Sequence, residues 1–256
     1  MTDFHFIVAV RNGGPWIRRC LDSLASQRDQ RFVIHVTDDA SEDDTVKEIQ
    51  RFRIENPTVR IRPVANRLRM GAMYNQYNAI ARAHADRRDV CVIVDGDDYL
   101  AHDNVLNVLA RCYDHSPELV CTYGSYRSEP HSETCIAPEP YPKVVAKDRD
   151  VRRWSLVNGI KVNHLRTFRA GAFMKIDPAR NFCWPNGNWF RVCCDTAVMI
   201  PLLEMAWLHY RFIDEILYVY NSENPDSDWR QSAFEINQTN HYILGELSPV
   251  WTNGHR

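Results

Sequence analysis

The chain has 256 residues, enough to bury a full hydrophobic core as one domain, or as one domain with an added lobe. Its composition is 45% hydrophobic and 25% charged, which is ordinary for a soluble globular protein. The formal net charge of −2 excludes a strong overall field that would attract nucleic acid or anionic lipid.

The cysteines and the N-terminal residues indicate the cellular compartment in which the protein works. None of the eight cysteines forms a C-x-x-C pair, which argues against zinc ribbons and thioredoxin-type chemistry. Several lie in apolar runs, as Cys91 does in residues 90–94, where a free thiol acts as a small hydrophobe. The first ten residues lack the basic region of a signal peptide, and their apolar run is too short to cross a bilayer. We therefore expect a cytoplasmic protein with no transmembrane segment.

Short β-branched runs alternate with helical patterns in the first half of the chain. The predicted strands, in chain order, are Phe4–Val10, Phe32–Thr37, Val59–Val64, Val90–Val94 and Leu119–Tyr123. Four helices are predicted between these strands. The first begins at Pro15 and the second follows a cap at Ser41, while the third and fourth span Gly71–His84 and Asn104–Tyr113. This alternation is typical of βαβ units on a mainly parallel sheet flanked by helices, an α/β fold.

The second half is less regular. From Ser125 to about Lys147 the pattern dissolves into Pro, Glu, His and Ser, which predicts a loop or an irregular crossing segment. Asp195–Trp207 is a predicted helix and Phe212–Tyr220 a late strand. From Asn221 onward the chain is polar and rich in turn residues, which predicts a mobile tail or a lid.

Two acidic clusters directly follow predicted strands. One is residues 38–45, after the strand that ends at Thr37, and the other is Asp95-Gly96-Asp97-Asp98, after the apolar strand 90–94. Ligands of open α/β sheets bind beyond the carboxyl ends of the strands, so both clusters should face one cleft. Such close carboxylates repel each other unless a cation compensates them, and Mg²⁺ or Mn²⁺ takes oxygen ligands while leaving positions for phosphate. The alternative is a helix cap at the first cluster and a simple turn at the second.

Four motifs occur together in a characteristic order and spacing over about the first 125 residues. They are Val8-Ala9-Val10-Arg11-Asn12, Trp16-Ile17-x-x-Cys20-Leu21-x-Ser23-Leu24-x-Ser26-Gln27, Asp38-Asp39-Ala40-Ser41-x-Asp43-x-Thr45, and Asp95-Gly96-Asp97-Asp98. In this order they resemble the GT-A fold glycosyltransferases of family 2. The resemblance implies a GT-A, Rossmann-like fold with a smaller C-terminal acceptor-side region.

The resemblance also implies donor-side roles. Ala9 and Arg11 would line the nucleotide pocket, and Asp39 would accept a hydrogen bond from the nucleobase. Asp97 matches the metal-ligating aspartate, and Asp95 matches the one that orients ribose or metal-bound water. The implied cofactor is Mn²⁺ or Mg²⁺.

The remaining donor residues lie near these. Asn66 and Gly71 match the stretch that passes the nucleotide and the donor sugar. Arg67 or Arg69, between them, can pair with the diphosphate as a bidentate donor, or can be a solvated loop charge. Gly96 belongs to the same implied nucleotide-sugar site.

Asp195 is the candidate catalytic base. Inverting members of the family use an aspartate just before a helix in the second half, often in an acidic pair, but this chain has Cys194 at the first position. Asp195 would take a proton from the acceptor hydroxyl. Its structural alternative is to cap the helix. Asp177 and Glu204 are the rival bases.

Three further residues are acceptor-side candidates. His164, in the segment His164–Arg169, can contact phosphate or acceptor, or can be structural. Trp184 and Trp189 lie in a turn-rich stretch before Asp195 and are candidates for stacking on an acceptor sugar, although large aromatics usually belong to a core.

Together these features predict an inverting, metal-dependent glycosyltransferase with a nucleotide-sugar donor, by default a UDP-sugar. The chain is then expected to divide into three parts. Residues 1–125 would bind the nucleotide-sugar, residues 126–225 would bind the acceptor and carry the catalytic base, and residues 226–256 would form a tail or lid. A sugar nucleotidylyltransferase is the second enzymatic hypothesis, although residues 11–14 are short for its glycine-rich loop. A catalytically silent module that binds a nucleotide or glycan is the third.

The sequence leaves the acceptor open among a glycan, a protein, a small molecule and a modified nucleic-acid base. The last rests on residues 143–180, where ten Lys or Arg stand against three Asp, an excess of seven positive charges. The alternative is a solvated face balanced by the acidic N-terminal half.

Overall fold

The computed structural model describes residues 1–29, 31–130, 134–135, 141–225, 227, 230 and 233–248. Its strands are β1 (Phe4–Val10), β2 (Phe32–Asp38), β3 (Ile61–Ala65), β4 (Val90–Asp95), β5 (Tyr99–Leu100), β6 (Cys121–Glu129), β7 (Thr134–Cys135), β8 (Arg166–Arg169) and β9 (Tyr210–Asn221). Its helices are α1 (Ile17–Ala25), α2 (Thr45–Glu55), α3 (Ala72–Ala83), α4 (Val105–His115), α5 (Lys143–Lys147), α6 (Val151–Asn158), α7 (Ala170–Phe173), α8 (Pro178–Asn181), α9 (Cys194–Ala206) and α11 (Ala233–His241), followed by the π-helix η1 (Tyr242–Glu246).

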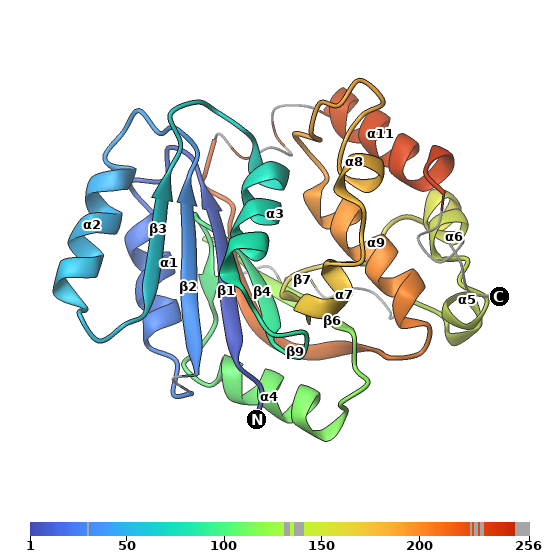
Figure 1. Cartoon of the computed structure of the whole chain (residues 1–256), viewed down its shortest axis with the longest axis horizontal. Helices are drawn as coiled ribbons and strands as arrows, with labels where there is room; N and C mark the ends of the chain where they lie inside the picture. Colours follow the sequence, from blue (N-terminus) through green and yellow to red (C-terminus); the bar gives the residue numbers. More distant parts are fainter. Residues whose placement is uncertain are drawn as a thin grey trace.

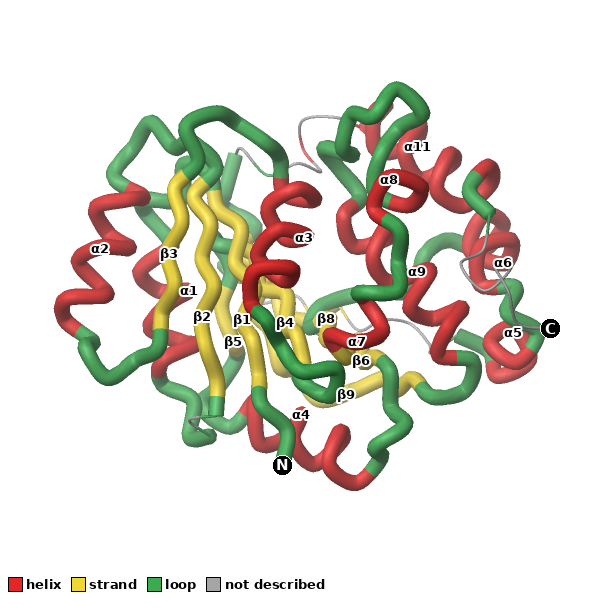
Figure 2. The backbone as a smooth tube through the Cα atoms, in the orientation of Figure 1, coloured by secondary structure: helices red, strands yellow, loops and turns green. Residues whose placement is uncertain are grey.

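The strands form one mixed sheet (Figure 2) in the order β3-β2-β1-β4-β8-β6-β9-β5. The short strand β7 pairs with β6 outside this order. In the N-terminal half, β1 pairs in parallel with both β2 and β4, and β2 pairs in parallel with β3. The register places Val10 opposite Asp38 and Ala9 opposite Asp95. Both predicted acidic clusters therefore begin at the same edge of the sheet.

Helices cover both faces of the sheet, as the alternation of side chains along β1 requires. Phe6 and Val8 belong to the core cluster that includes buried residues of α1, α2 and α4. Ile7, between them, belongs to a second cluster with residues of α3 and α9. Figure 1 shows the two layers, with α1 and α2 on one side of the β1–β3 edge and α3 between the sheet and the C-terminal helices.

The second half of the sheet is antiparallel where it meets the first. β8 inserts between β4 and β6 and runs antiparallel to each, with Ile93 opposite Arg166. The sequence pattern predicted no strand here. The predicted loop at residues 125–147 is wrong at both ends, since β6 continues to Glu129 and α5 occupies its last five residues. Residues 131–133 and 136–140 of that segment lie outside the described part of the chain.

The segment after Asn221 contains more regular structure than its composition indicates. Residues 233–246 form α11 and η1, two helical elements that the sequence pattern did not predict. Arg152 on α6 holds the region together because it donates to the Glu204 carboxylate on α9 at 2.7 Å and to the carbonyl of Ile243 on η1. None of the helices among the described residues has the length and apolar character needed to cross a membrane.

One predicted cap is also wrong. Ser41 does not begin α2, whose N-cap position is Asp44. The Ser41 hydroxyl instead accepts a hydrogen bond from the Asn12 amide at 2.8 Å, and so joins the turn after β1 to the turn after β2.

Candidate active site

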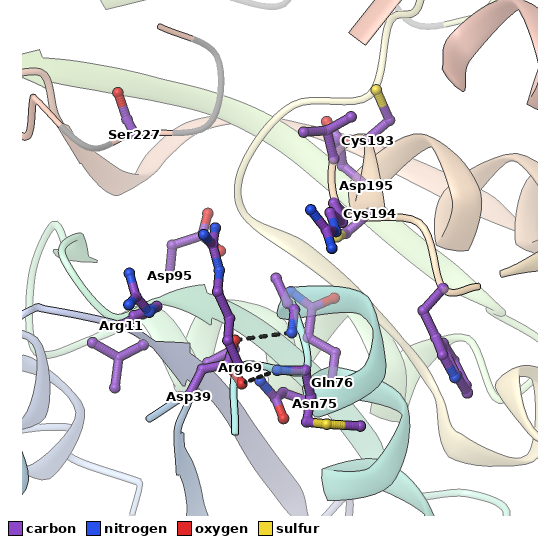
Figure 3. A pocket seen from close by; sticks show the side chains of 18 of the residues that line it. Arg11, Asp39, Arg69, Asn75, Gln76, Asp95, Cys193, Cys194, Asp195 and Ser227 are labelled. Atoms are coloured by element: carbon purple, nitrogen blue, oxygen red, sulfur yellow. Dashed lines mark hydrogen bonds between the residues drawn. The ribbon is translucent and has the colours of Figure 1, made fainter. Parts of the chain in front are cut away.

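A cleft of about 1110 Å³ opens at the carboxyl ends of β1, β2 and β4 and faces the start of α9. Figure 3 shows Asp39 and Asp95 on the sheet side, with Cys193, Cys194 and Asp195 across the cleft. Its charged lining residues come from seven separate parts of the chain: Arg11, Asp39, Glu42, Arg69, Asp95, Asp97, Asp98, Arg166, Arg191, Asp195 and Glu235. The topology therefore gathers carboxylates and guanidinium groups around one cavity.

Asp39 organises the turn that leads into α3. Its carboxylate accepts hydrogen bonds from the amides of Met70 and Gly71, at 2.8 and 2.9 Å, and from the Asn66 side chain at 3.1 Å. Burial by itself would raise the pKa of Asp39, but these hydrogen bonds outweigh it and the net shift is downward. Gly71 has a φ of +89°, a backbone conformation that favours glycine. Asp39 thus fixes this wall of the cleft in its ionised form.

The turn after β4 carries three carboxylates. Asp98 is buried and both of its oxygens are engaged, by the Tyr218 hydroxyl and the Asn221 amide, each at 2.7 Å. It therefore anchors β9 to this turn. Asp95 and Asp97 are only partly buried and line the cleft.

Asp97 and Asp95 have the chemistry of a hard cation site. Burial raises the pKa of Asp97, and the charge of Asp95 raises it further, while a hydrogen bond from the Asn224 side chain at 2.7 Å partly offsets this. Burial also raises the pKa of Asp95. Two crowded carboxylates whose ionised forms are disfavoured fit a divalent cation with oxygen ligands, because the cation relieves their repulsion.

A second grouping of possible metal ligands lies beside them. Single ligand atoms of Asp95, Asp98 and His164 lie within 4.8 Å of one another. Asp98 is already satisfied by two hydrogen bonds, and the His164 Nδ1 atom lies 3.0 Å from an Arg166 nitrogen. Asp95 and Asp97 are therefore the better pair for the cation.

His164 is packed as a structural aromatic. Its ring stacks on the Tyr218 ring with centroids 4.4 Å apart and an interplanar angle of 11°. Burial, and then the charge of Arg166, lower the pKa of His164 well below its ordinary value, so the ring stays neutral. It lines the cleft and helps to enclose the Arg166 guanidinium.

Arg166 is one of the cleft residues that the sequence pattern did not single out. Its side chain is 8% exposed, and its guanidinium lies 3.3 Å from an Asp95 oxygen and 3.6 Å from an Asp195 oxygen. It reaches the cleft because β8 lies next to β4, a pairing across more than 70 residues of chain. Asn224 was missed as well, and no local motif marks it.

Asp195 lies in the first turn of α9, where it is 39% exposed and lines the cleft. It does not occupy the N-cap position, which is Cys193 with a φ of +60°. The two rival bases lie elsewhere. Asp177 caps α8 by accepting from the Ala179 amide, and Glu204 is fully buried against Arg152.

The other predicted residues divide between the cleft lining and its surroundings. Ala9, Arg11, Arg69, Gly71, Trp184 and Trp189 line the cleft, whereas Asn66, Arg67 and Gly96 are not among its lining residues. Arg67 is exposed on the turn before α3. Gly96 instead packs against β1, where an added Cβ would lie 2.5 Å from the Val10 Cβ.

The two tryptophans line the cleft but also contribute to the core beside it. Trp189 packs against Tyr74 and Tyr77 of α3, with centroids 5.3 and 5.4 Å away. Trp184 packs against Tyr242 and Phe190. Both side chains remain partly exposed toward the cavity.

Comparison with known proteins places this cleft in context. The family model described as glycosyl transferase family 2 matches residues 5–177. The dTDP-rhamnosyl transferase RfbG of Shigella flexneri is 30% identical over 128 residues, which are 47% of this chain and 43% of that protein. The match to the family model includes the turns that carry Asp39, Asp95 and Asp97, and it favours glycosyl transfer over nucleotidyl transfer.

Solved structures share the fold. TarS of S. aureus superimposes with a TM-score of 0.63 at 17% identity, over 98% of this chain and 48% of that one. TarS residues 1–349 in complex with UDP-GlcNAc give a TM-score of 0.58 at 17% identity, over 87% of this chain and 59% of that one. The mannosyltransferase PcManGT from Pyrobaculum calidifontis, in complex with GDP-Man and Mn²⁺, gives 0.57 at 18% identity, over 88% and 58%. The predicted α/β fold of GT-A type is thus confirmed, and this chain spans about half the length of these relatives.

Proposed function

Because this chain belongs to glycosyl transferase family 2, we propose that its cleft transfers a sugar from a nucleoside-diphosphate sugar to an acceptor hydroxyl. One observation carries the proposal. The carboxylates of Asp95 and Asp97, at the end of β4, share a single cavity with Asp195, at the start of α9. One side offers a cation site for a diphosphate, and the other offers a base for an acceptor.

On the donor side, Asp97 and Asp95 would hold Mn²⁺ or Mg²⁺ next to the diphosphate. The cation, when bound, neutralises negative charge on the leaving nucleoside diphosphate. Ala9 and Arg11 lie beside the wall that Asp39 organises, and the nucleobase would bind there. Arg69 also lines the cavity and would pair with phosphate oxygens.

On the acceptor side, Asp195 would take the proton of the acceptor hydroxyl as that oxygen bonds to the anomeric carbon. The bond between the anomeric carbon and the diphosphate oxygen breaks in the same displacement, which inverts the anomeric configuration. Trp184 and Trp189 offer partly exposed rings for an acceptor sugar.

Two of the similar solved structures contain different nucleotide-sugars, since TarS is in complex with UDP-GlcNAc and PcManGT with GDP-Man. The RfbG relative is named for a dTDP-linked donor. We therefore extend the UDP-sugar default to a panel of UDP-, GDP- and dTDP-sugars.

A donor screen tests the proposal. The protein would be incubated with each nucleotide-sugar and either Mn²⁺ or Mg²⁺, and the released nucleoside diphosphate measured. We expect one donor class to be cleaved, with cleavage abolished by a chelator. If no donor is cleaved or bound with either metal, the proposal fails and a silent binding module becomes the better account.

A further inference from the structure

Arg166 occupies the space between the two functional halves of the cleft. Its guanidinium approaches Asp95 at 3.3 Å and Asp195 at 3.6 Å, and its side chain is 8% exposed. Asp95 belongs to the proposed cation site and Asp195 is the proposed base. A single buried positive charge therefore serves both carboxylates.

The distances indicate that this charge is shared. Charge-assisted bonds between a guanidinium and a carboxylate are about 2.7–2.9 Å long when fully formed. Both contacts of Arg166 are longer, and its Nε atom is buried with no hydrogen-bond partner among the described residues. The guanidinium thus retains unused hydrogen-bonding capacity.

The surroundings keep the group in place without fixing it to one partner. Arg166 lies on β8, whose backbone pairs with β4, so its Cα is held at the level of Ile93. The neutral His164 ring, stacked on Tyr218, closes one side, and its Nδ1 atom lies 3.0 Å from the same Arg166 nitrogen that approaches Asp95. One terminal nitrogen faces Asp95 and the other faces Asp195, so the guanidinium reaches both carboxylates from a fixed strand.

We propose that Arg166 is a positioning residue that acts as an internal counter-cation. In the metal-free protein it compensates Asp95 and so competes with a divalent cation. When a cation and donor occupy the Asp95–Asp97 side, Arg166 is released toward Asp195 and aligns that carboxylate for the acceptor. This coupling rests on the proposed function, because it assigns Asp95 to the cation and Asp195 to the acceptor.

Binding of Mn²⁺ alone, measured by electron paramagnetic resonance without donor, tests the competition. The first comparison establishes the cation site: wild type should bind Mn²⁺, and Asp97→Ala should not. Arg166→Gln should then bind Mn²⁺ on the order of tenfold more tightly, since a competing charge has been removed from Asp95. Arg166→Lys keeps the charge and should stay within about threefold of wild type. The control is Arg169→Gln, also on β8, because Arg169 donates to the carbonyls of Arg88 and Tyr113 outside the cleft.

A second pair of variants covers the case in which Arg166→Gln does not fold. Asp195→Asn removes one partner, so Arg166 should commit to Asp95 and weaken Mn²⁺ binding by about threefold. Glu235→Gln, which removes another cleft carboxylate, should not reproduce that change. In transfer assays Arg166→Lys should lower kcat far more than it raises the acceptor KM, because a compact ammonium cannot bridge two carboxylates.

The outcomes separate the two proposals. If wild type binds no Mn²⁺, or Asp97→Ala binds it equally well, the cation site of the proposed function fails and this coupling fails with it. If that site is established but folded Arg166→Gln binds Mn²⁺ no more tightly than wild type, only the counter-cation role is overturned. Should Arg166→Gln not fold, equal Mn²⁺ affinities in Asp195→Asn and Glu235→Gln would overturn it instead.

Discussion

Asp195 is the proposed base for the acceptor hydroxyl. Its position in the first turn of α9 does not by itself distinguish it from a structural helix residue. Replacing it with asparagine keeps the size of the side chain and removes the proton acceptor. We expect transfer kcat to fall on the order of 10²- to 10⁴-fold, the usual contribution of general base catalysis, while the donor KM changes by less than about tenfold. Steady-state kinetics with the identified donor and acceptor give both constants.

The matched control is Asp177→Asn. Asp177 was a rival base on sequence grounds, but the structure has it capping α8 through the Ala179 amide. This variant should retain wild-type kcat and lose at most about 1 kcal/mol of stability. Equal losses of kcat in the two variants would remove Asp195 from the base role.

Single residues were the hardest level to predict from the sequence. Asp39, Asp95 and Asp97 were marked by their position directly after apolar strands, and the structure places all three in one cleft. Arg166 had no such signal, because its four-residue strand is polar and pairs with β4 only through tertiary structure. Asn224 becomes relevant only because its side chain donates to Asp97, far away in sequence.

Among the elements, the tight turn between β4 and β5 depends on Gly96. A Cβ at this position would lie 2.5 Å from the Val10 Cβ and 3.3 Å from the Ala9 carbonyl oxygen, so the backbone of the turn would have to shift. Gly96→Ala should lower the free energy of unfolding by about 1–3 kcal/mol, as overpacking does. It should also weaken Mn²⁺ binding, because Asp95 and Asp97 flank the glycine.

Gly245→Ala is the matched control, since its added methyl would meet nothing closer than 3.9 Å. Denaturant unfolding and Mn²⁺ titration of the two variants give the comparison. Unchanged stability and Mn²⁺ affinity in Gly96→Ala would show that the turn does not depend on this contact.

The paired strands β1 and β2 contain a buried source of acid sensitivity. His35 lies 3.0 Å from His5 between nitrogen atoms, and burial, followed by the charge of His5, lowers the pKa of His35 from 6.5 to about 4. The folded state therefore binds this proton less readily than the unfolded state. Stability from this group is complete above pH 6.5 and is lost progressively as the pH falls toward 4.

Substitution of His35 tests that origin. Urea unfolding of His35→Gln between pH 7 and 4 should show a smaller loss of unfolding free energy than wild type, by on the order of 1–3 kcal/mol. His115→Gln, at an exposed position on α4, should follow the wild-type curve. If all three curves run parallel, the acid sensitivity arises elsewhere.

Elements with a long apolar run or an apolar face were predictable, and those set by tertiary contacts were not. The predicted helices at 71–84 and 195–207 correspond to α3 and α9 within a residue at each end, because α3 has one apolar face and α9 is a long run that is apolar on nearly all sides. β8 and β5 are short and lack such a pattern, and β5 has only two residues. α11 was missed because a polar surface helix shows little periodicity.

For the molecule as a whole, charge distribution bears on the acceptor. The positive excess of residues 143–180 suggested an anionic acceptor such as a nucleic acid. Three of those cations are committed inside the protein, Arg152 to Glu204, Arg166 to the cleft, and Arg169 to backbone carbonyls. The rest of the stretch therefore carries less positive charge for a partner than its composition implies.

We accordingly expect no retention of duplex DNA by this protein at about 150 mM salt, where phosphate contacts are already weakened. A gel-shift series in salt measures this. A complex that persists at that salt and has a steep salt dependence would return the nucleic-acid acceptor to first place.

The proposed transfer reaction depends on a cation held at Asp97 beside a nucleoside diphosphate, and calorimetry of nucleotide binding tests this most directly. The nucleoside diphosphate of the active donor would be titrated into wild type and Asp97→Ala, each with and without Mn²⁺. We predict that Mn²⁺ strengthens binding to wild type by at least about tenfold and has no effect on binding to Asp97→Ala. Equal strengthening by Mn²⁺ in both proteins would contradict the assignment of this cleft.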